Sequence, residues 1–307
     1  INTFKDEKWG NCVKLSNKKI EIVAALDFGP RIMRFNFAGE ENIFHEDVNF
    51  DVNNEVPEYG FKEENRKVWQ NYGGHRIWVA PESDPRTYYP DNTPVEWYKK
   101  DDGIVLCPPE ETKNNIKKEM QIVMHDDNNV DIIQRVKNTG MWPIKFALWG
   151  VSVMSRGGME VIAQPDRATG LLQNRVVALW PYSKMNDKRV TWGEKYITLM
   201  QDEKNISSFK FGINNEKGWA AYFNHNNLFI NRYDQYIDKE YPDGGMSFES
   251  YSNNFILEME TLSPMHIFKP GEVREHTEHL ALFDNVKRPD NDEKRIYEVL
   301  SKFIDMD

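Results

Sequence analysis

Apolar and polar residues alternate with a period of two along much of this chain, which is typical of half-buried β-strands. The alternation is clearest in four stretches: residues 20–24, 130–136, 209–213 and 255–259. Turn-forming pairs separate such stretches, among them Asn128-Asn129, Gly157-Gly158 and Pro270-Gly271. Many strands at short spacing favour an all-β, mostly antiparallel fold, either a sandwich or a barrel.

The end of the chain follows a helical period instead. Apolar residues there recur at the spacing of one helix face: Ile296, Val299, Leu300, Phe303 and Ile304. Asp290 and Glu293 form a capping pair just before this stretch. We therefore expect a short C-terminal helix at about residues 290–305, lying on a sheet.

Two segments interrupt the strand pattern. Residues 45–70 are acidic and rich in asparagine, and they are predicted as a long excursion. Residues 81–115 are rich in proline and tyrosine, and they are predicted as a loop-rich insertion. The chain has no internal repeat, low-complexity tract or composition shift, so we expect one domain over residues 1–307.

Charge and composition narrow the possible partners. The 307 residues carry a formal net charge of −10, which disfavours nucleic acid and anionic membranes as partners. Two cysteines are too few for a disulfide framework, and no apolar run reaches about 18 residues, so a cytoplasmic protein is expected. The first residue is Ile1, and a cleaved signal before it stays open. No Walker-type loop or dinucleotide fingerprint is present, so we expect no cofactor.

Residues 72–82 combine a glycine pair with polar side chains at the start of an apolar strand. His75 and Arg76 follow the two glycines, and residues 77–79 read as a buried strand that ends before Pro81. Glycine lets the backbone turn sharply or approach a ligand closely. The stretch therefore predicts either a site for a polar ligand or a hairpin corner with an exposed histidine and a structural ion pair.

A second candidate is the pair Glu258 and Glu260, which are two residues apart in a predicted strand. Such residues share one face of the strand, roughly 6.5–7 Å apart. Mutual repulsion and lost solvation raise the pKa of one carboxyl toward the range useful for acid–base catalysis. The alternative is a solvated outer face of an edge strand.

Arginines and histidines give weaker signals. Arg31 and Arg175 each lie beside an apolar strand, where an arginine pairs either with a carboxylate of the protein or with a ligand. His276 and His279 are three residues apart, so in a strand they point to opposite faces and cannot chelate one ion together. We expect no metal site.

Several motifs together resemble the galactose mutarotase-like superfamily, also called aldose 1-epimerase-like. Asp27-Phe-Gly-Pro-Arg-Ile-Met-Arg34, followed by Glu41-Asn-Ile-Phe44, resembles its opening Gly-x-Arg strand and Asn-Leu-Leu-like segment. The stretch from Ser250 to Pro264 resembles its Tyr-Thr and Glu-x-x-x-x-Pro strand, and Pro270-Gly-Glu272 resembles its closing motif. The glycine pair with His75 and the segment Trp180-Pro-Tyr182 resemble a bacterial branch, so the resemblance covers nearly the whole chain.

This resemblance implies a galactose mutarotase-like β-supersandwich with a groove for a sugar. In aldose 1-epimerases a glutamate is the general base on the anomeric hydroxyl, and a histidine protonates the ring oxygen. Glu260 matches the glutamate, and His75 is the candidate histidine, although it follows its glycine pair where the family pattern has it before. Trp149 stands about where a second family histidine is expected, and tryptophan cannot act as a general acid.

Three hypotheses follow for a small carbohydrate as the partner. The first is an aldose 1-epimerase-type isomerase, with Glu260 as base, His75 as acid and Glu258 beside them. Substrate contacts are then expected from six side chains: Arg76, Arg31, Arg175, Trp149, Trp180 and Glu258. The second is a non-catalytic carbohydrate-binding protein with the same groove, and the third is a lyase or hydrolase of acidic sugars. The arginines slightly favour an anionic sugar, and the sequence leaves the oligomeric state open.

Overall fold

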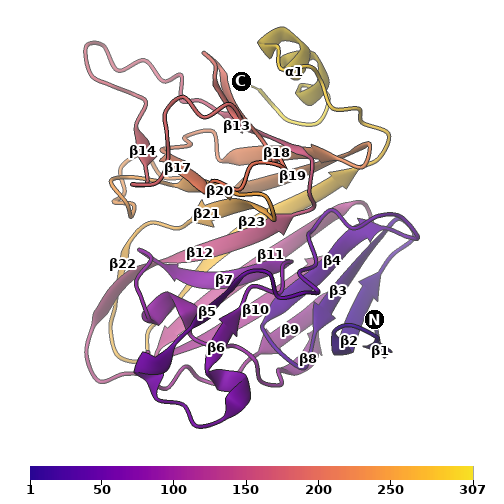
Figure 1. Ribbon diagram of the computed structural model, residues 1–307, viewed down its shortest axis with the longest axis vertical. Coiled ribbons are helices and arrows are strands. Elements are labelled where there is room, and N and C mark those ends of the chain that lie inside the picture. Colours follow the sequence, from indigo (N-terminus) through magenta and orange to yellow (C-terminus); the bar gives the residue numbers. More distant parts are fainter. Residues whose placement is uncertain (307) are drawn as a thin grey trace.

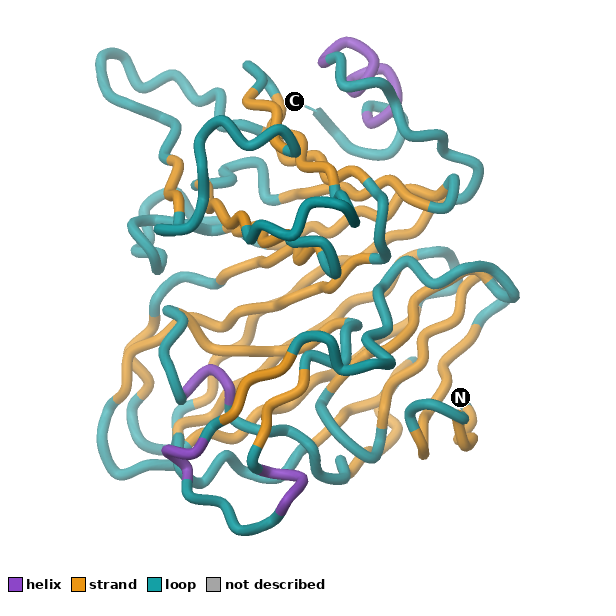
Figure 2. The backbone as a smooth tube through the Cα atoms, viewed as in Figure 1, coloured by secondary structure: helices purple, strands orange, loops and turns teal. Residues whose placement is uncertain are grey.

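Two large antiparallel β-sheets face each other and make up most of the structure (Figure 1). The structure is a computed structural model that describes residues 1–306. Strands dominate the backbone, and helix is confined to short pieces (Figure 2). The expected all-β fold with a short C-terminal helix is confirmed.

The first sheet carries the N-terminus at one edge and mid-chain strands at the other. Its strands in spatial order are β1 (Asn2–Asp6), β2 (Gly10–Ser16), β3 (Ile20–Ala25), β4 (Arg31–Phe37), β7 (His75–Ala80), β12 (Ile144–Met154), β21 (Leu257–Leu262), β20 (Phe248–Ser252), β17 (Phe209–Ile213) and β14 (Val177–Leu179). β22 (His266–Phe268) also pairs with β12. The sheet thus brings segments about 180 residues apart in sequence onto one surface.

The second sheet covers one face of the first. Its strands in spatial order are β15 (Val190–Trp192), β16 (Tyr196–Met200), β13 (Met159–Ala163), β18 (Trp219–Asn224), β19 (Asn227–Tyr233), β23 (Val273–Phe283), β11 (Asn129–Asn138), β10 (Ile116–Met124), β9 (Gly103–Cys107) and β8 (Glu96–Lys100). His276 and His279 of β23 point to opposite faces, as expected, since His276 is buried and His279 is half exposed.

The apolar core fills the space between the two sheets. Residues of the first sheet such as Ile22 and Met259 belong to the same buried cluster as Ile132 and Leu280 of the second. Within a strand, the residues between these core positions point to the other face of the sheet. On this other face, β2, β3 and β4 carry a small apolar cluster that includes Cys12 and Val23, and the later strands carry polar and aromatic side chains.

The two irregular segments contain more regular structure than predicted. Residues 45–70 form a small ribbon of β5 (Asn53–Glu55) and β6 (Val68–Gln70), with short 3₁₀ turns at Pro57–Tyr59 and Glu64–Arg66. Residues 81–115 are loop-rich, as predicted, but they also hold a 3₁₀ turn at Arg86–Tyr88 and the paired strands β8 and β9, which were not predicted. Prolines bound these strands and do not interrupt them.

The C-terminal helix α1 (Glu293–Leu300) is shorter than expected, and its cap differs. Asp292, not Asp290, is the N-cap, and its side chain accepts a hydrogen bond from the Arg295 backbone N–H. Ile296 and Leu300 pack against residues of the second sheet, as predicted. Within residues 1–306, no helix is long and apolar enough to cross a membrane.

Candidate active site

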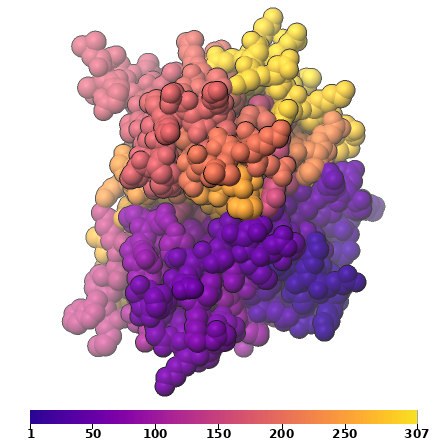
Figure 3. Space-filling model, viewed as in Figure 1, coloured from indigo at the N-terminus to yellow at the C-terminus, as the bar shows by residue number. Residues whose placement is uncertain are grey.

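A groove of about 280 Å³ lies on the face of the first sheet that points away from the core. Its floor comes from β7, β12, β21, β20 and β17, and its walls come from loops near β6, β7 and β14. The lining residues are Val52, Trp69, Asn71, Arg76, Trp78, Glu82, Tyr88, Trp149, Tyr182, Ser208, Lys210, Tyr251, Ile256, Glu258 and Glu260. The lining therefore joins residues from the first third of the chain, purple in Figure 3, to residues from Trp149 onward.

Strand alternation explains how these side chains reach the groove. In β21, Leu257 and Met259 belong to the core between the sheets, so Glu258 and Glu260 point the other way. In β7, Ile77 belongs to the core, so the residues on either side of it face the groove. Glu258 and Glu260 thus lie on one face of β21, as their spacing predicts, and both line the groove.

Lys210 and Glu260 form the centre of the charged floor. The Lys210 ammonium lies 2.9 Å from Glu260 Oε2 and 2.8 Å from Glu249 Oε2. The indole N–H of Trp149 donates to the same Glu260 oxygen at 2.9 Å. The Nζ of Lys210 also lies 4.7 Å from the ring centres of both Trp149 and Trp180, a cation–π arrangement.

Burial controls the protonation of this cluster. Burial raises the pKa of Glu260 to about 7, although Lys210 acts in the opposite direction, and Glu258 adds to the rise. Burial likewise raises the pKa of Glu249 to about 8 against the same lysine. For Lys210, burial lowers the pKa, but Glu249, Glu260 and Glu82 together raise it well above its usual range. The raised pKa of Lys210 keeps the lysine charged at neutral pH, and the raised pKa values of both carboxyls let the pair retain a proton there.

Arg76 and Glu258 form a second buried pair in the groove. Arg76 Nη2 lies 2.9 Å from Glu258 Oε1, and the amide of Asn71 donates to the same oxygen at 3.3 Å. The guanidinium lies over the ring of Trp78, 4.0 Å from its centre. The Nε and Nη1 atoms of Arg76 are buried and have no hydrogen-bond partner among residues 1–306, so this groove-lining arginine has two unsatisfied donors.

Aromatic rings form much of the remaining wall. Trp69 on β6 and Trp149 each contact Trp78, with ring centres 5.1 Å apart in both pairs. Tyr88 lies edge-on to Trp69 and Trp78, at 5.4 and 5.5 Å. Flat apolar faces beside charged hydrogen-bonding groups suit a ligand with both C–H faces and hydroxyl groups.

His75 does not reach this groove, which corrects the prediction that it joins Glu260. It is fully buried on the opposite face of β7, between the two sheets. Its Nδ1 lies 2.9 Å from Ser152 Oγ, and its Nε2 lies 3.0 Å from the amide nitrogen of Gln134 and 3.2 Å from Glu278. Burial, and next Arg76, lower the pKa of His75 to about 3, so it is a neutral interior residue.

Arg31 and Arg175 also lie outside the groove lining. Arg31 is fully buried, pairs with Asp91 at 3.0 Å and donates to the backbone oxygens of Gln70 and Asn71. It therefore holds the segment that follows β6. Arg175 donates to the Pro165 backbone oxygen and lines another cavity. Two of the three arginines that favoured an anionic sugar are thus elsewhere in the fold.

Trp180, the remaining predicted contact, is half-buried and packs against Lys210 without belonging to the groove lining. Lys210 and Glu249 themselves were not predicted. The sequence does indicate which way each side chain points, because each residue follows a core phenylalanine, Phe209 or Phe248, within a strand. A charged residue at such a position points to the outer face. That β20 lies beside β21, with β17 on the other side of β20, becomes apparent only from the sheet order.

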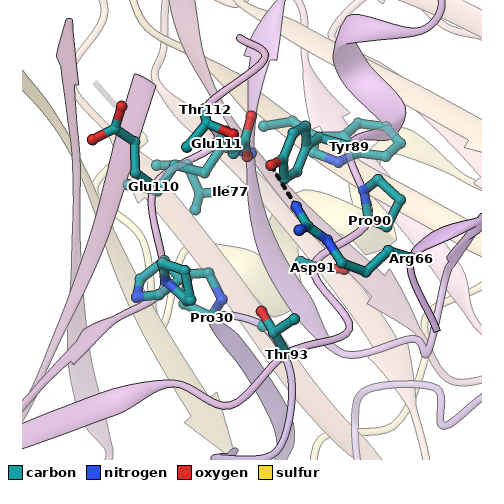
Figure 4. A pocket seen from close by; sticks show the side chains of 15 residues that line it. Pro30, Arg66, Ile77, Tyr89, Pro90, Asp91, Thr93, Glu110, Glu111 and Thr112 are labelled. Carbon is teal, nitrogen blue, oxygen red and sulfur yellow. Dashed lines mark hydrogen bonds and ion pairs between the residues drawn. The ribbon is translucent and has the colours of Figure 1, made fainter. Parts of the chain in front are cut away.

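A second cavity of about 290 Å³ lies near the first and has a different character. Figure 4 shows Arg66 hydrogen-bonded to the Tyr89 hydroxyl, at 2.7 Å, with Pro30 and Pro90 on the walls. Glu111, also in its lining, already pairs with Lys118. This cavity contains neither Glu258 nor Glu260, and its Asp91 is already paired with the buried Arg31, so the groove is the better candidate site.

Comparison with known proteins identifies the fold. No protein-family model and no curated protein match the sequence. Solved structures do match.

A galactose mutarotase-like protein from Lactobacillus casei is 10% identical with a TM-score of 0.55, over 88% of this chain and 99% of the other. A Klebsiella pneumoniae protein, provisionally assigned as an aldose 1-epimerase, is 13% identical with a TM-score of 0.59, over 95% and 82%. A provisionally assigned mutarotase from Salmonella typhimurium is 12% identical with a TM-score of 0.56, over 89% and 90%. The chain therefore has the galactose mutarotase-like fold.

Proposed function

We propose that the groove binds a small carbohydrate and that the protein interconverts its anomers, with Glu260 as the general base. The observation that carries this proposal is the state of Glu260, whose pKa burial raises to about 7 on the floor of an aromatic groove. A base of that pKa accepts a proton efficiently at neutral pH. The resemblance of the sequence and the names of the similar structures point to the same chemistry.

The acid in this proposal is Lys210, because His75 lies on the far side of the sheet. Lysine has three N–H donors, and Glu249 and Glu260 take two of them. The third is available to the ring oxygen of a bound sugar. Glu260 Oε1 has no partner within residues 1–306, so it is the atom that would take the proton from the anomeric hydroxyl. Ring opening, rotation about C1–C2 and closure then exchange the two anomers.

A non-catalytic sugar-binding protein is the second candidate. One observation favours it: Glu260 Oε2 is already held by both Lys210 and Trp149, which restrains the carboxylate that must react. The groove contains no histidine among its lining residues. The aromatic walls and the free donors of Arg76 would serve binding equally well in both cases.

Two measurements on the unaltered protein test the proposal. Tryptophan fluorescence follows the binding of neutral, amino and uronic sugars, since three indoles line the groove. Exchange NMR then compares the anomer interconversion rate of a bound sugar with the rate in buffer. Acceleration supports the isomerase, binding without acceleration leaves the second candidate, and a groove that binds no sugar contradicts both.

A further inference from the structure

We propose that the groove selects cationic amino sugars over sugars that carry a carboxylate, and that Glu82 is the residue that sets this preference. The inference rests on the proposed function, because it names the class of sugar that the same groove would take. It reverses the anionic preference suggested by the arginine-rich sequence.

The charges of the groove lining are the first argument. The lining contains two cations, Arg76 and Lys210, and three carboxylates, Glu82, Glu258 and Glu260. Arg76 is neutralised by Glu258 at 2.9 Å. Lys210 is shared between Glu260 and Glu249, so no cation in the lining is left to attract an anionic group. A carboxylated sugar would meet excess negative charge here.

Glu82 is the carboxylate that stays uncompensated. It follows β7 at the rim of the groove and is exposed. Its contact within residues 1–306 is a hydrogen bond from the hydroxyl of Tyr88, and no lysine or arginine of that part lies within ion-pair distance. The influence of its charge still extends to the groove floor, where it raises the pKa values of Lys210 and Glu260.

The ring of Tyr88 reinforces the preference. Arg76 and Lys210 already lie over Trp78 and Trp149, but Tyr88 lies in the same lining, its hydroxyl donates to Glu82, and the face of an aromatic ring attracts an ammonium group. A protonated amine on a sugar therefore finds an unpaired carboxylate beside an aromatic ring. A hydroxyl at the same position would gain only a neutral hydrogen bond, and a carboxylate would be repelled.

The experiment compares matched sugars at about pH 7 by tryptophan fluorescence titration. In both the gluco and the galacto series, the parent hexose, the 2-amino-2-deoxy sugar, its N-acetyl derivative and the uronic acid are measured. We expect the amino sugar to bind roughly three- to ten-fold more tightly than the parent hexose, since a half-exposed ion pair contributes about 1 kcal/mol, a factor of about five. The uronic acid should bind most weakly, and N-acetylation should remove the advantage.

Glu82→Gln should bring the ratio of amino-sugar to parent-hexose affinity close to one. The matched control is Glu58→Gln, an exposed glutamate outside the groove lining, which should leave that ratio unchanged. Equal binding of parent and amino sugar by the unaltered protein would overturn the inference but leave the proposed function standing. Tighter binding of the uronic acid, or a ratio unaffected by Glu82→Gln, would overturn it too. Binding of no sugar at all would overturn both.

Discussion

The ammonium nitrogen of Lys210 lies 2.9 Å from a carboxylate oxygen of Glu260. Glu249 holds the same ammonium at 2.8 Å, so the candidate base shares its counterion with a second buried carboxyl. One ammonium group cannot neutralise the charges of two ionised carboxylates in a buried site, so one carboxyl tends to keep its proton. The proton that remains among them makes this cluster suited to acid–base chemistry near neutral pH.

Removing the lysine should destabilise the protein in a pH-dependent manner. Lys210→Met leaves Glu249 and Glu260 buried without a cation, which costs about 3–5 kcal/mol when both are ionised. Their folded-state pKa values lie above the unfolded value, so the folded variant binds more protons and loses stability as pH rises above about 4.5. Urea denaturation should show a large loss at pH 8 and a much smaller one at pH 5.

The matched control is Lys67→Met, which removes a lysine that is about half exposed and pairs with Glu64. It should change the unfolding free energy by less than about 1 kcal/mol at either pH. If the Lys210→Met protein were as stable at pH 8 as the wild type, this would contradict the claim that Lys210 neutralises two buried carboxylates.

His75→Asn should affect stability and not catalysis. The substitution disturbs the contacts with Ser152 and Gln134 between the sheets, and an unsatisfied buried group costs about 1–3 kcal/mol. Because the side chain faces away from Glu260, the anomer interconversion rate should remain within about two-fold of the wild type. His125→Asn, on the exposed surface, serves as the stability control. A rate loss of about a hundred-fold with unchanged stability would restore His75 as a catalytic acid.

Trp149→Phe should shift the pH dependence of the reaction upward. The indole N–H donates to Glu260 Oε2 at 2.9 Å, and a hydrogen bond to the ionised form keeps the pKa of Glu260 lower than it would otherwise be. Phenylalanine keeps a ring but removes the donor. The acidic limb of the pH–rate profile should therefore move up by about one unit, since a hydrogen bond to a charged group contributes about 1.5 kcal/mol or more.

Trp142→Phe is the control for that shift, because Trp142 is largely exposed and lies outside the groove lining. Its profile should match that of the wild type. A downward shift in Trp149→Phe would mean that the indole does not stabilise the ionised carboxylate.

Much of the fold could be predicted because it depends on local alternation. The stretch at residues 130–136 became β11, and residues 209–213 became β17, since apolar side chains at every second position need one buried face. The strands β8 and β9 inside the loop-rich segment 81–115 were not predicted, because the prolines of this segment were interpreted as signs of loop. They lie between strands, and the core residues Ile104 and Leu106 of β9 still alternate.

The site could be predicted only for residues whose orientation follows from their spacing within a single strand. Glu258 and Glu260 share a face by their spacing alone, whichever strands lie beside them. For His75 and Arg76 the sequence showed adjacency but did not indicate which of the two faced the core. Lys210 and Glu249 belong to the site only because their strands lie next to β21 or one strand further in the sheet. The local sequence pattern does not indicate the order of strands that are about 50 residues apart.

Arg76 and Arg175 offer a matched pair for sugar binding. Arg76→Ala removes a cation that lines the groove and has two free donor atoms, so the dissociation constant of a bound sugar should rise roughly 10- to 100-fold. Arg175→Ala changes a residue outside the groove and should leave affinity unchanged. Fluorescence titration measures both, and circular dichroism checks that each variant is folded. Equal losses in the two variants would place the sugar elsewhere.

The role of Glu260 as the base is tested most directly by the anomer interconversion rate of Glu260→Gln, measured by exchange NMR on a sugar shown to bind. Glutamine keeps the shape and one hydrogen-bonding oxygen but cannot accept the proton, so the rate should fall by about 10²–10⁴-fold while the dissociation constant changes little. An accelerated rate that persists unchanged in Glu260→Gln would contradict the account.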